Sequence, residues 1–150
     1  MTTTRKPTGQ LGPIVVGFDG SPPSLGALQW AAAEAVLKGL QLHVVAAWHM
    51  PNMLGWAVPL PENFDPVEPA ETVLRQAQQS IGDHYPGLVV QTHAEEGLAG
   101  RCLIDTAASV GASLLVVGAR GHGELTGLLI GSVSEFVATH AKCPVVIVRH

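Results

Sequence analysis

The sequence predicts an α/β domain built on an open, mostly parallel sheet of five strands, with helices on both faces. Three observations predict this fold class. The chain has 150 residues, which is the length of one domain with a sizeable core. Short apolar runs alternate with segments of helical periodicity from one end to the other. Hydrophobic residues make up 47% of the chain and charged residues 13%, a balance typical of strands covered on both faces.

The N-terminal segment separates into a polar lead-in and a first strand. Residues 1–12 are polar and interrupted by Gly and Pro, so we expect them to be disordered and the domain to occupy residues 13–150. The β-rich run at residues 14–18 predicts the first strand. A turn-like Asp-Gly-Ser follows it at residues 19–21.

A helix and a second strand come next. Ser21 is a good N-cap, and Pro22 stands where a first helical turn tolerates proline. Apolar residues then recur at helical spacing until Lys38, which Gly39 follows as a stop signal. The nearly apolar run at residues 40–48 predicts the second strand.

The middle of the chain contains a proline-rich stretch. Residues 49–69 hold five prolines, and we expect a surface loop that either covers a ligand or packs its aromatic residues against the sheet. Residues 71–82 predict the second helix, and residues 88–90 begin the third strand.

The last third of the chain predicts two further helix–strand units. A helix over residues 100–110 leads to a buried strand at 114–117, and a glycine-rich segment follows at 118–131. A helix over 132–140 and a strand at 143–148 end the pattern. Alternating strands and helices favour parallel strands joined by right-handed crossovers.

The glycine-rich segment joins the end of a buried strand to the start of a helix. Glycines allow positive φ and let backbone N–H groups approach a ligand. A helix start adds unpaired N–H groups and the positive end of the dipole, and Ser132 and Ser134 add hydroxyl donors there. Together these features predict a site for phosphate groups.

A purely structural interpretation of the same residues is open. The run from Ser132 to Glu135 has the form of a capping box, in which the helix satisfies its own donors. Two other nucleotide motifs are excluded: no P-loop lysine is present, and the glycines follow the fourth strand rather than the first, where a dinucleotide fingerprint belongs.

Composition and spacing argue against several other function classes. The net charge is -4 and the eight basic residues are scattered, so we expect no binding to nucleic acid or to membrane surfaces. No apolar run approaches a membrane span and the N-terminus lacks a signal peptide, so we expect a cytoplasmic protein. Cys102 and Cys143 are expected to be free thiols, and neither they nor the histidines have metal-ligand spacing. No catalytic residue can be assigned, because no nucleophile–base motif is present.

The glycine-rich segment also resembles a known family. The spacing G-x2-G-x9-G-S over residues 118–132 is similar to the G-x2-G-x9-G-[S/T] signature of ATP-binding universal stress proteins. The first strand and its turn, at residues 16–21, and the ending at 143–148 resemble the same family. These matches stand in the right order, and the resemblance covers residues 12–149.

The resemblance implies a strand order of 3-2-1-4-5, in an adenine nucleotide alpha hydrolase-like fold. It implies that the chain binds ATP, with or without Mg, or a related adenine nucleotide, and acts in stress response or signalling. It also implies a homodimer through the C-terminal strand, Val145–Val148, whose open edge would otherwise be a liability. Any enzymatic activity would be at most slow ATP hydrolysis.

The resemblance also places the site. A ligand is expected at the switch point between strands one and four, where Asp19 faces Gly118. In this family the position of Asp19 approaches the ribose or adenine, and the position of Ala47 offers backbone groups to the base. The positions around the ribose and phosphates match Gly118, Gly121, Gly131, Ser132 and Val133. Arg120, His122 and Ser134 lie in the same segment and could contact phosphate oxygens.

Two alternatives stay open at this point. A protein of the same fold could bind cyclic AMP, in which case the adenine site persists and the triphosphate contacts matter less. A nucleotide-independent interaction module is the other alternative, and in it the glycine-rich segment would have a structural role alone.

Overall fold

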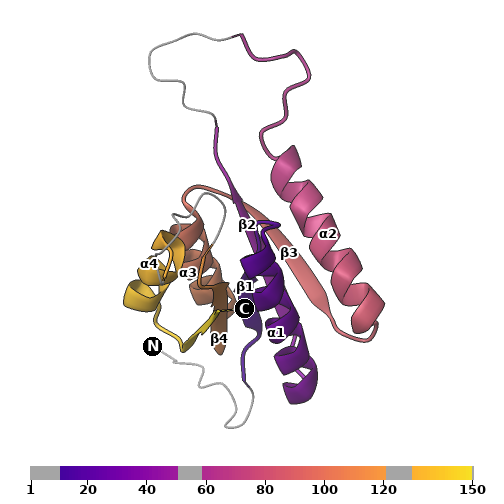
Figure 1. Ribbon diagram of the computed structural model, residues 1–150, viewed down its shortest axis with the longest axis vertical. Helices are drawn as coiled ribbons and strands as arrows, with labels where there is room; N and C mark the ends of the chain where they lie inside the picture. The colour runs from indigo at the N-terminus through magenta and orange to yellow at the C-terminus, as the bar shows by residue number, and fades with distance from the viewer. Residues whose placement is uncertain (1–10, 51–58, 121–129, 150) are drawn as a thin grey trace, which may run out of the picture.

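A computed structural model of the protein describes residues 11–50, 59–120 and 130–149. In this part of the chain strands and helices alternate, as the sequence predicts (Figure 1). The elements are β1 (Ile14–Gly17), α1 (Pro22–Lys38), β2 (Leu42–Trp48), α2 (Glu68–His84), β3 (Val90–Glu96), α3 (Ala99–Val110), β4 (Leu114–Gly118), α4 (Ser132–His140) and β5 (Val145–Val148).

The five strands form one sheet in the order β3-β2-β1-β4-β5. This confirms the order that the family resemblance implies. Every strand pairing in the described part of the chain is parallel, so the sheet is parallel throughout rather than mostly parallel. β1 lies at the centre, between β2 and β4.

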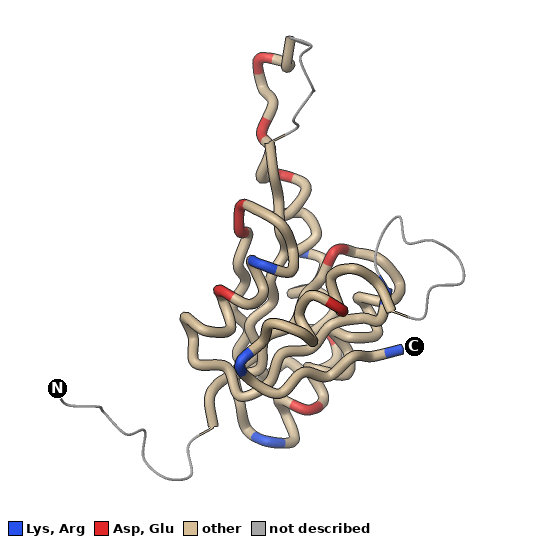
Figure 2. Tube along the Cα trace, turned by 90° about the vertical axis from the view of Figure 1, so that its left-hand side faces the viewer, with Lys and Arg blue, Asp and Glu red and all other residues tan. Residues whose placement is uncertain are grey.

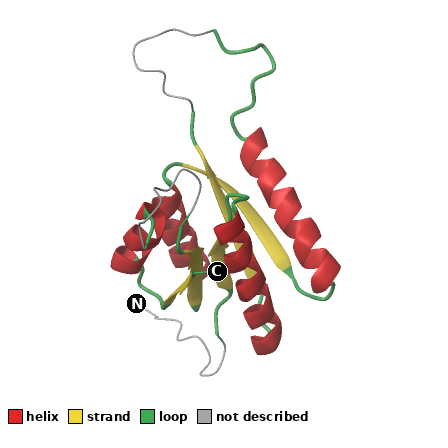
Figure 3. Cartoon of the chain, in the orientation of Figure 1, coloured by secondary structure: helices red, strands yellow, loops and turns green. Residues whose placement is uncertain are grey.

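Helices cover both faces of the sheet (Figure 3). Alternate residues of the central strands point to opposite faces, so Val16 and Val44 belong to one hydrophobic cluster with α1 and α2. Val15 and Val45 belong to a second cluster with α3 and α4. Because the central strands are buried on both sides, they read in the sequence as continuous apolar runs.

The boundaries of α1 follow from its end residues. The Ser21 side chain accepts a hydrogen bond from Ser24 N at 3.4 Å, so Ser21 is the N-cap that the sequence predicts. Gly39 ends the helix in the left-handed region, with φ of 65°, where a side chain would be strained.

Several elements differ in their bounds from the sequence prediction: β2 and β5 each begin two residues later than predicted, and α2 and β3 also differ. α2 runs from Glu68 to His84, longer at both ends than predicted, because Pro69 is tolerated in the first turn and does not stop the helix. β3 begins at Val90 rather than at residue 88, and it is largely polar. As an edge strand covered incompletely, it does not need a continuous apolar run.

The described part of the proline-rich segment, residues 59–67, projects from the body of the domain. Figures 1 and 2 show its described part rising beyond the end of β2 and returning to α2. Leu60 and Phe64, at 45% and 38% exposed, lie in this part. Residues 51–58, which hold the rest of the predicted loop, lie outside the described residues.

The described residues add three observations to the predictions from composition. Lys and Arg stand apart from one another along the trace (Figure 2). None of the described helices is long and apolar enough to cross a bilayer. Cys102 is buried and Cys143 half-buried, both as free thiols, and burial raises the pKa of each.

Candidate functional site

A cavity of about 280 Å³ opens at the carboxyl ends of β1, β2 and β4. This is the switch point of the sheet, because the chain leaves β1 for β2 on one side while β4 pairs on the other. The cavity is lined by Gly17, Phe18, Asp19, Ser24, Val45, Ala46, Ala47, Pro69, Ala70, Val73, Ala99, Leu103, Val117, Gly118, Arg120, Gly131, Val133 and Ser134.

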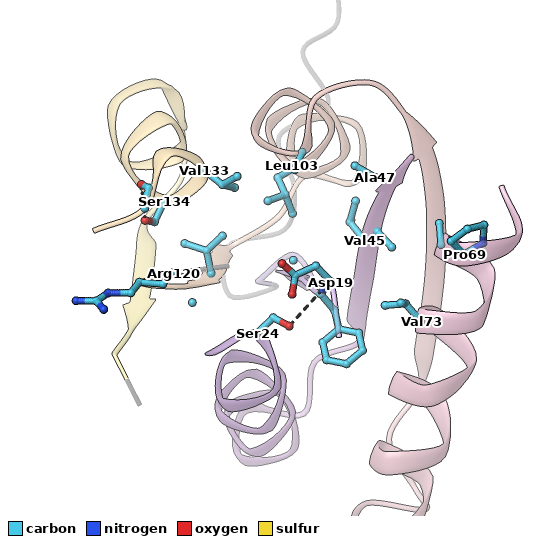
Figure 4. A pocket seen from close by; sticks show the side chains of 18 residues that line it. Asp19, Ser24, Val45, Ala47, Pro69, Val73, Leu103, Arg120, Val133 and Ser134 are labelled. Atoms are coloured by element: carbon cyan, nitrogen blue, oxygen red, sulfur yellow. Dashed lines mark hydrogen bonds between the residues drawn. The ribbon is translucent and has the colours of Figure 1, made fainter. Parts of the chain in front are cut away.

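One side of the cavity is apolar. Val45 and Ala47 come from β2, Leu103 from α3, and Pro69 and Val73 from α2 (Figure 4). Leu103 and Val45 are nearly fully buried, so their positions are fixed by the core beneath them. These side chains give this side of the cavity, called here the apolar slot, a lining without a charged group.

The polar side of the cavity centres on Asp19, at the end of β1. Its Oδ1 accepts hydrogen bonds from Ser21 N, at 2.9 Å, and from the Ser21 hydroxyl. Asp19 N in turn donates to Ser24 Oγ at 3.3 Å (Figure 4). Both serines belong to the buried N-terminal turn of α1, so the helix cap that the sequence predicts also orients the carboxylate.

Gly118, at the end of β4, lines the cavity together with Asp19. A Cβ atom at this position would lie 2.8 Å from the carbonyl oxygen of Pro23 and 2.9 Å from its carbonyl carbon. The described glycines with positive φ do not include Gly118 or Gly131, so neither of these two serves a left-handed turn. At 118 the requirement is close approach to the backbone of α1.

Several groups predicted to hold phosphate are already used within the protein. Ala119 N donates to Val148 O at 2.8 Å, and Gly131 N donates to Ala119 O at 2.6 Å. The Ser134 hydroxyl is buried and donates toward the carbonyl oxygens of Ala119 and Gly131, at 3.1 and 2.9 Å. Gly131 N and the Ser134 hydroxyl therefore have hydrogen-bond partners within the protein.

The start of α4 keeps other donors available. The first helical bond is Glu135 N to Gly131 O, at 3.0 Å, and the N–H groups before it have no partner within a helix. The N-cap is Gly131 with no side-chain hydrogen bond, so the predicted capping box from Ser132 to Glu135 is wrong. A capping box needs a serine at the N-cap, and Ser132 lies one residue inside the helix.

The remaining predicted residues are distributed unevenly around the cavity. Val133 lines it, whereas Ser132 is exposed and does not. Arg120 lines it too, but its guanidinium points away from Asp19 (Figure 4). Gly121 and His122 lie outside the described residues.

The apolar side of the site was missed from the sequence. Leu103, Val73 and Pro69 sit on helices, where their spacing is that of core residues, and Val45 lies inside a continuous apolar run. Nothing in that spacing separates a side chain that lines a cavity from one that fills the core. The strand ends were the available signal, since ligands bind outside the carboxyl ends of parallel strands.

The arrangement is suited to binding. Among the described residues that line the cavity, the ionisable side chains are those of Asp19 and Arg120. Asp19 accepts hydrogen bonds from Ser21, and the cavity places an apolar slot next to it. A ligand with a flat apolar ring, neighbouring hydroxyl groups and an anionic end would match the apolar slot, the Asp19 carboxylate and the start of α4, respectively.

Comparison with known proteins gives consistent matches. A family model described as the Universal stress protein family matches residues 11–149. A universal stress protein of Mycobacterium tuberculosis is 38% identical over 146 residues, which is 95% of this chain and 47% of that protein. The chain therefore spans about half the length of the curated relatives it matches.

Solved structures share the fold. A universal stress protein in complex with cAMP is 29% identical, with a TM-score of 0.67 over 92% of this chain and 96% of that one. The universal stress protein UspA from Lactobacillus plantarum has a TM-score of 0.75 at 22% identity, over 93% of this chain and 99% of that one. The second likeness shows the fold alone.

Proposed function

The chain belongs to the universal stress protein family, and from this premise we propose that it binds an adenine nucleotide in the cavity beside Asp19. The observation that carries the proposal is the juxtaposition of three features in one hollow. An apolar slot, a carboxylate held by a helix cap, and the start of α4 follow one another around the carboxyl ends of the strands. The 29% identical structure that holds cAMP supports an adenine ligand.

Within this site each part of the nucleotide has a suitable partner. The adenine would enter the slot between Val45, Leu103 and Val73. The ribose hydroxyls would donate to the Asp19 carboxylate, which is an acceptor when ionised. Phosphates would lie at the start of α4, near Val133, where unpaired N–H groups and the helix dipole favour an anion.

We further propose ATP, with Mg on its phosphates, as the nucleotide. The protein would have two conformational states, and a difference in nucleotide affinity between them would transmit a stress or signalling response. Binding ATP more tightly than cyclic AMP in competition supports this form of the proposal. The opposite order would instead assign the site to cyclic AMP.

Replacing Asp19 tests the nucleotide site directly. Asp19→Asn keeps the shape of the side chain and removes its charge, and we expect ATP affinity to fall by about tenfold or more, because hydrogen bonds to charged groups contribute about 1.5–3 kcal/mol. Isothermal titration calorimetry with ATP and Mg measures the change. Asp83→Asn, on the exposed end of α2, is the matched control and should bind as the unmodified chain does.

Two outcomes would contradict the proposal. Unchanged affinity of the Asp19→Asn variant would remove the carboxylate from the site. Absence of any nucleotide in the freshly purified protein, together with no thermal shift on adding ATP and Mg, would favour a nucleotide-independent interaction module instead.

We also propose a homodimer through β5. This strand, Val145–Val148, is an edge of the sheet and is apolar and half-buried, and pairing with a second copy would cover its open side. We expect sedimentation at micromolar concentration to give the mass of a dimer. A monomer at that concentration would count against this interface. A Val146→Lys variant that sediments at the same position as the unmodified chain would also count against it.

A further inference from the structure

A pair of histidines lies between β2 and β3, beside the nucleotide cavity. His43 Nδ1 and His93 Nε2 are 2.8 Å apart, and the two rings are stacked, with centroids 5.0 Å apart and 17° between their planes. His43 is 6% exposed, whereas His93, on the edge strand, is half-buried. The parallel pairing of the two strands brings together residues that are 50 positions apart.

The pair is continuous with the wall of the cavity. Side chains alternate along a strand, so His43 points to the same face of the sheet as Val45 and Ala47. In the sheet register, Gly17 lies beside Val45 and Val45 lies beside His93. Because Gly17 and Val45 line the nucleotide cavity, His93 extends the same row of residues toward the edge of the sheet.

Ionisable groups face this pair from two elements. On β3, Glu95 Oε1 lies 3.9 Å from His93 Nδ1. A second hollow, of about 250 Å³, separates β3 from α3, and its ionisable lining besides His93 is Glu95, Glu96, Cys102 and Asp105. On the β1 side, the residue in register with His43 is the apolar Val15.

The geometry of the pair accepts one positive charge and resists a second. With two facing nitrogens 2.8 Å apart, one must donate and the other must accept. A first proton taken up by the pair leaves the hydrogen bond between the rings in place, and the Glu95 carboxylate lies beside the pair. A second proton would set N–H against N–H and place a buried charge next to a like charge, so the rings would have to separate.

The pKa of His43 is lowered by burial and, secondly, by His93. A histidine whose pKa is lowered in the folded state stabilises the fold at pH values above the ordinary histidine pKa, which is about 6.5. That stability is lost as the pH falls from there toward the lowered value. Acid therefore favours states in which the His43 ring has left its site.

We propose that the His43–His93 pair is a proton-operated switch on the nucleotide cavity. Separating the rings displaces Val45 and the facing α3 side chains that form the adenine slot, so that nucleotide affinity falls at acid pH. This inference rests on the proposed function of the cavity. By linkage, nucleotide binding in turn opposes protonation of the pair.

The test compares the pH dependence of ATP affinity in the unmodified chain and in His43→Gln. Titration calorimetry between pH 8 and pH 5 gives both profiles, and titration of the ATP phosphates affects the two equally. We expect the affinity of the unmodified chain to fall by up to about tenfold per pH unit relative to the variant, the limit for one linked proton. His140→Gln, an exposed control whose ring contacts Phe136 of its own helix, should keep the unmodified profile.

Each outcome decides the inference. Parallel profiles for the unmodified chain and His43→Gln overturn the switch and leave nucleotide binding intact. If no protein binds ATP at pH 8, the proposed function fails and the switch fails with it. Should thermal unfolding at pH 8 show that His43→Gln does not fold, His93→Gln decides instead, because its amide can turn to suit either state of His43.

Discussion

Replacing Leu103 by alanine is expected to lower the free energy of unfolding by about 2–5 kcal/mol, the range for truncating a leucine in a well-packed core. Leu103 is 3% exposed and packs in the cluster beneath α3. It also covers Gly17, where a Cβ atom would lie 3.0 Å from Leu103 Cδ1. Because the core around Leu103 is close-packed, we expect its lost contacts not to be recovered by rearrangement of its neighbours.

The same substitution is expected to weaken ATP binding, because Leu103 is part of the adenine slot. Leu103→Met keeps most of the volume, so we expect it to change stability by less than about 1.5 kcal/mol and to retain binding. Urea unfolding followed by circular dichroism measures the stability of both variants. Leu98→Ala, at a position 82% exposed just before α3, is the control and should stay within about 0.5 kcal/mol.

A result below about 1 kcal/mol for Leu103→Ala would contradict this account of the core. It would mean that the space left by the side chain is filled by water entering from the cavity, and that α3 is held by its other contacts. ATP affinity then separates the two roles of Leu103. If the variant loses ATP binding but keeps its stability, the proposed role of Leu103 in the apolar slot stands, and its proposed role in core packing does not.

Periodicity was enough to predict the layers of this fold. Val15 and Val16 sit in the middle of a sheet covered on both faces, so their run is apolar without interruption, and the strand could be placed to within one residue. For the strand at residues 90–96, the sequence predicted an approximate start and no end. This strand lies at an edge, and its polar residues include the half-buried His93 and the exposed Glu95.

The site was predictable where backbone chemistry leaves a mark in the sequence. The N-cap Ser21 and the turn before it were predicted from local patterns, whereas Asp19 and Gly118 were assigned to the site by the family resemblance. The hydrogen bonds of Gly131 N and the Ser134 hydroxyl depend on the start of α4 lying next to Ala119. No local sequence pattern encodes that contact, so it could be found only from the structure.

Replacing Gly118 by alanine is expected to damage both the fold and the site. The added methyl group would meet the Pro23 carbonyl at less than 3 Å, and backbone cannot rotate away as a flexible side chain can. Either β4 or the first turn of α1 must shift, which we expect to lower the free energy of unfolding by about 1–3 kcal/mol. Because that turn holds Ser21 and Ser24, which orient Asp19, ATP affinity should fall by roughly tenfold or more.

Gly82→Ala is the matched control for this prediction. Gly82 lies inside α2 with no atom within 4 Å of an added Cβ, so alanine there should raise stability, by about 0.5–1 kcal/mol. Urea unfolding and calorimetry with ATP give both quantities for each variant. Changes of opposite sign in the free energy of unfolding of the two variants would locate the effect in the contact between β4 and α1. A Gly118→Ala variant with unchanged stability would show that the end of β4 can move and that Asp19 is positioned without this contact.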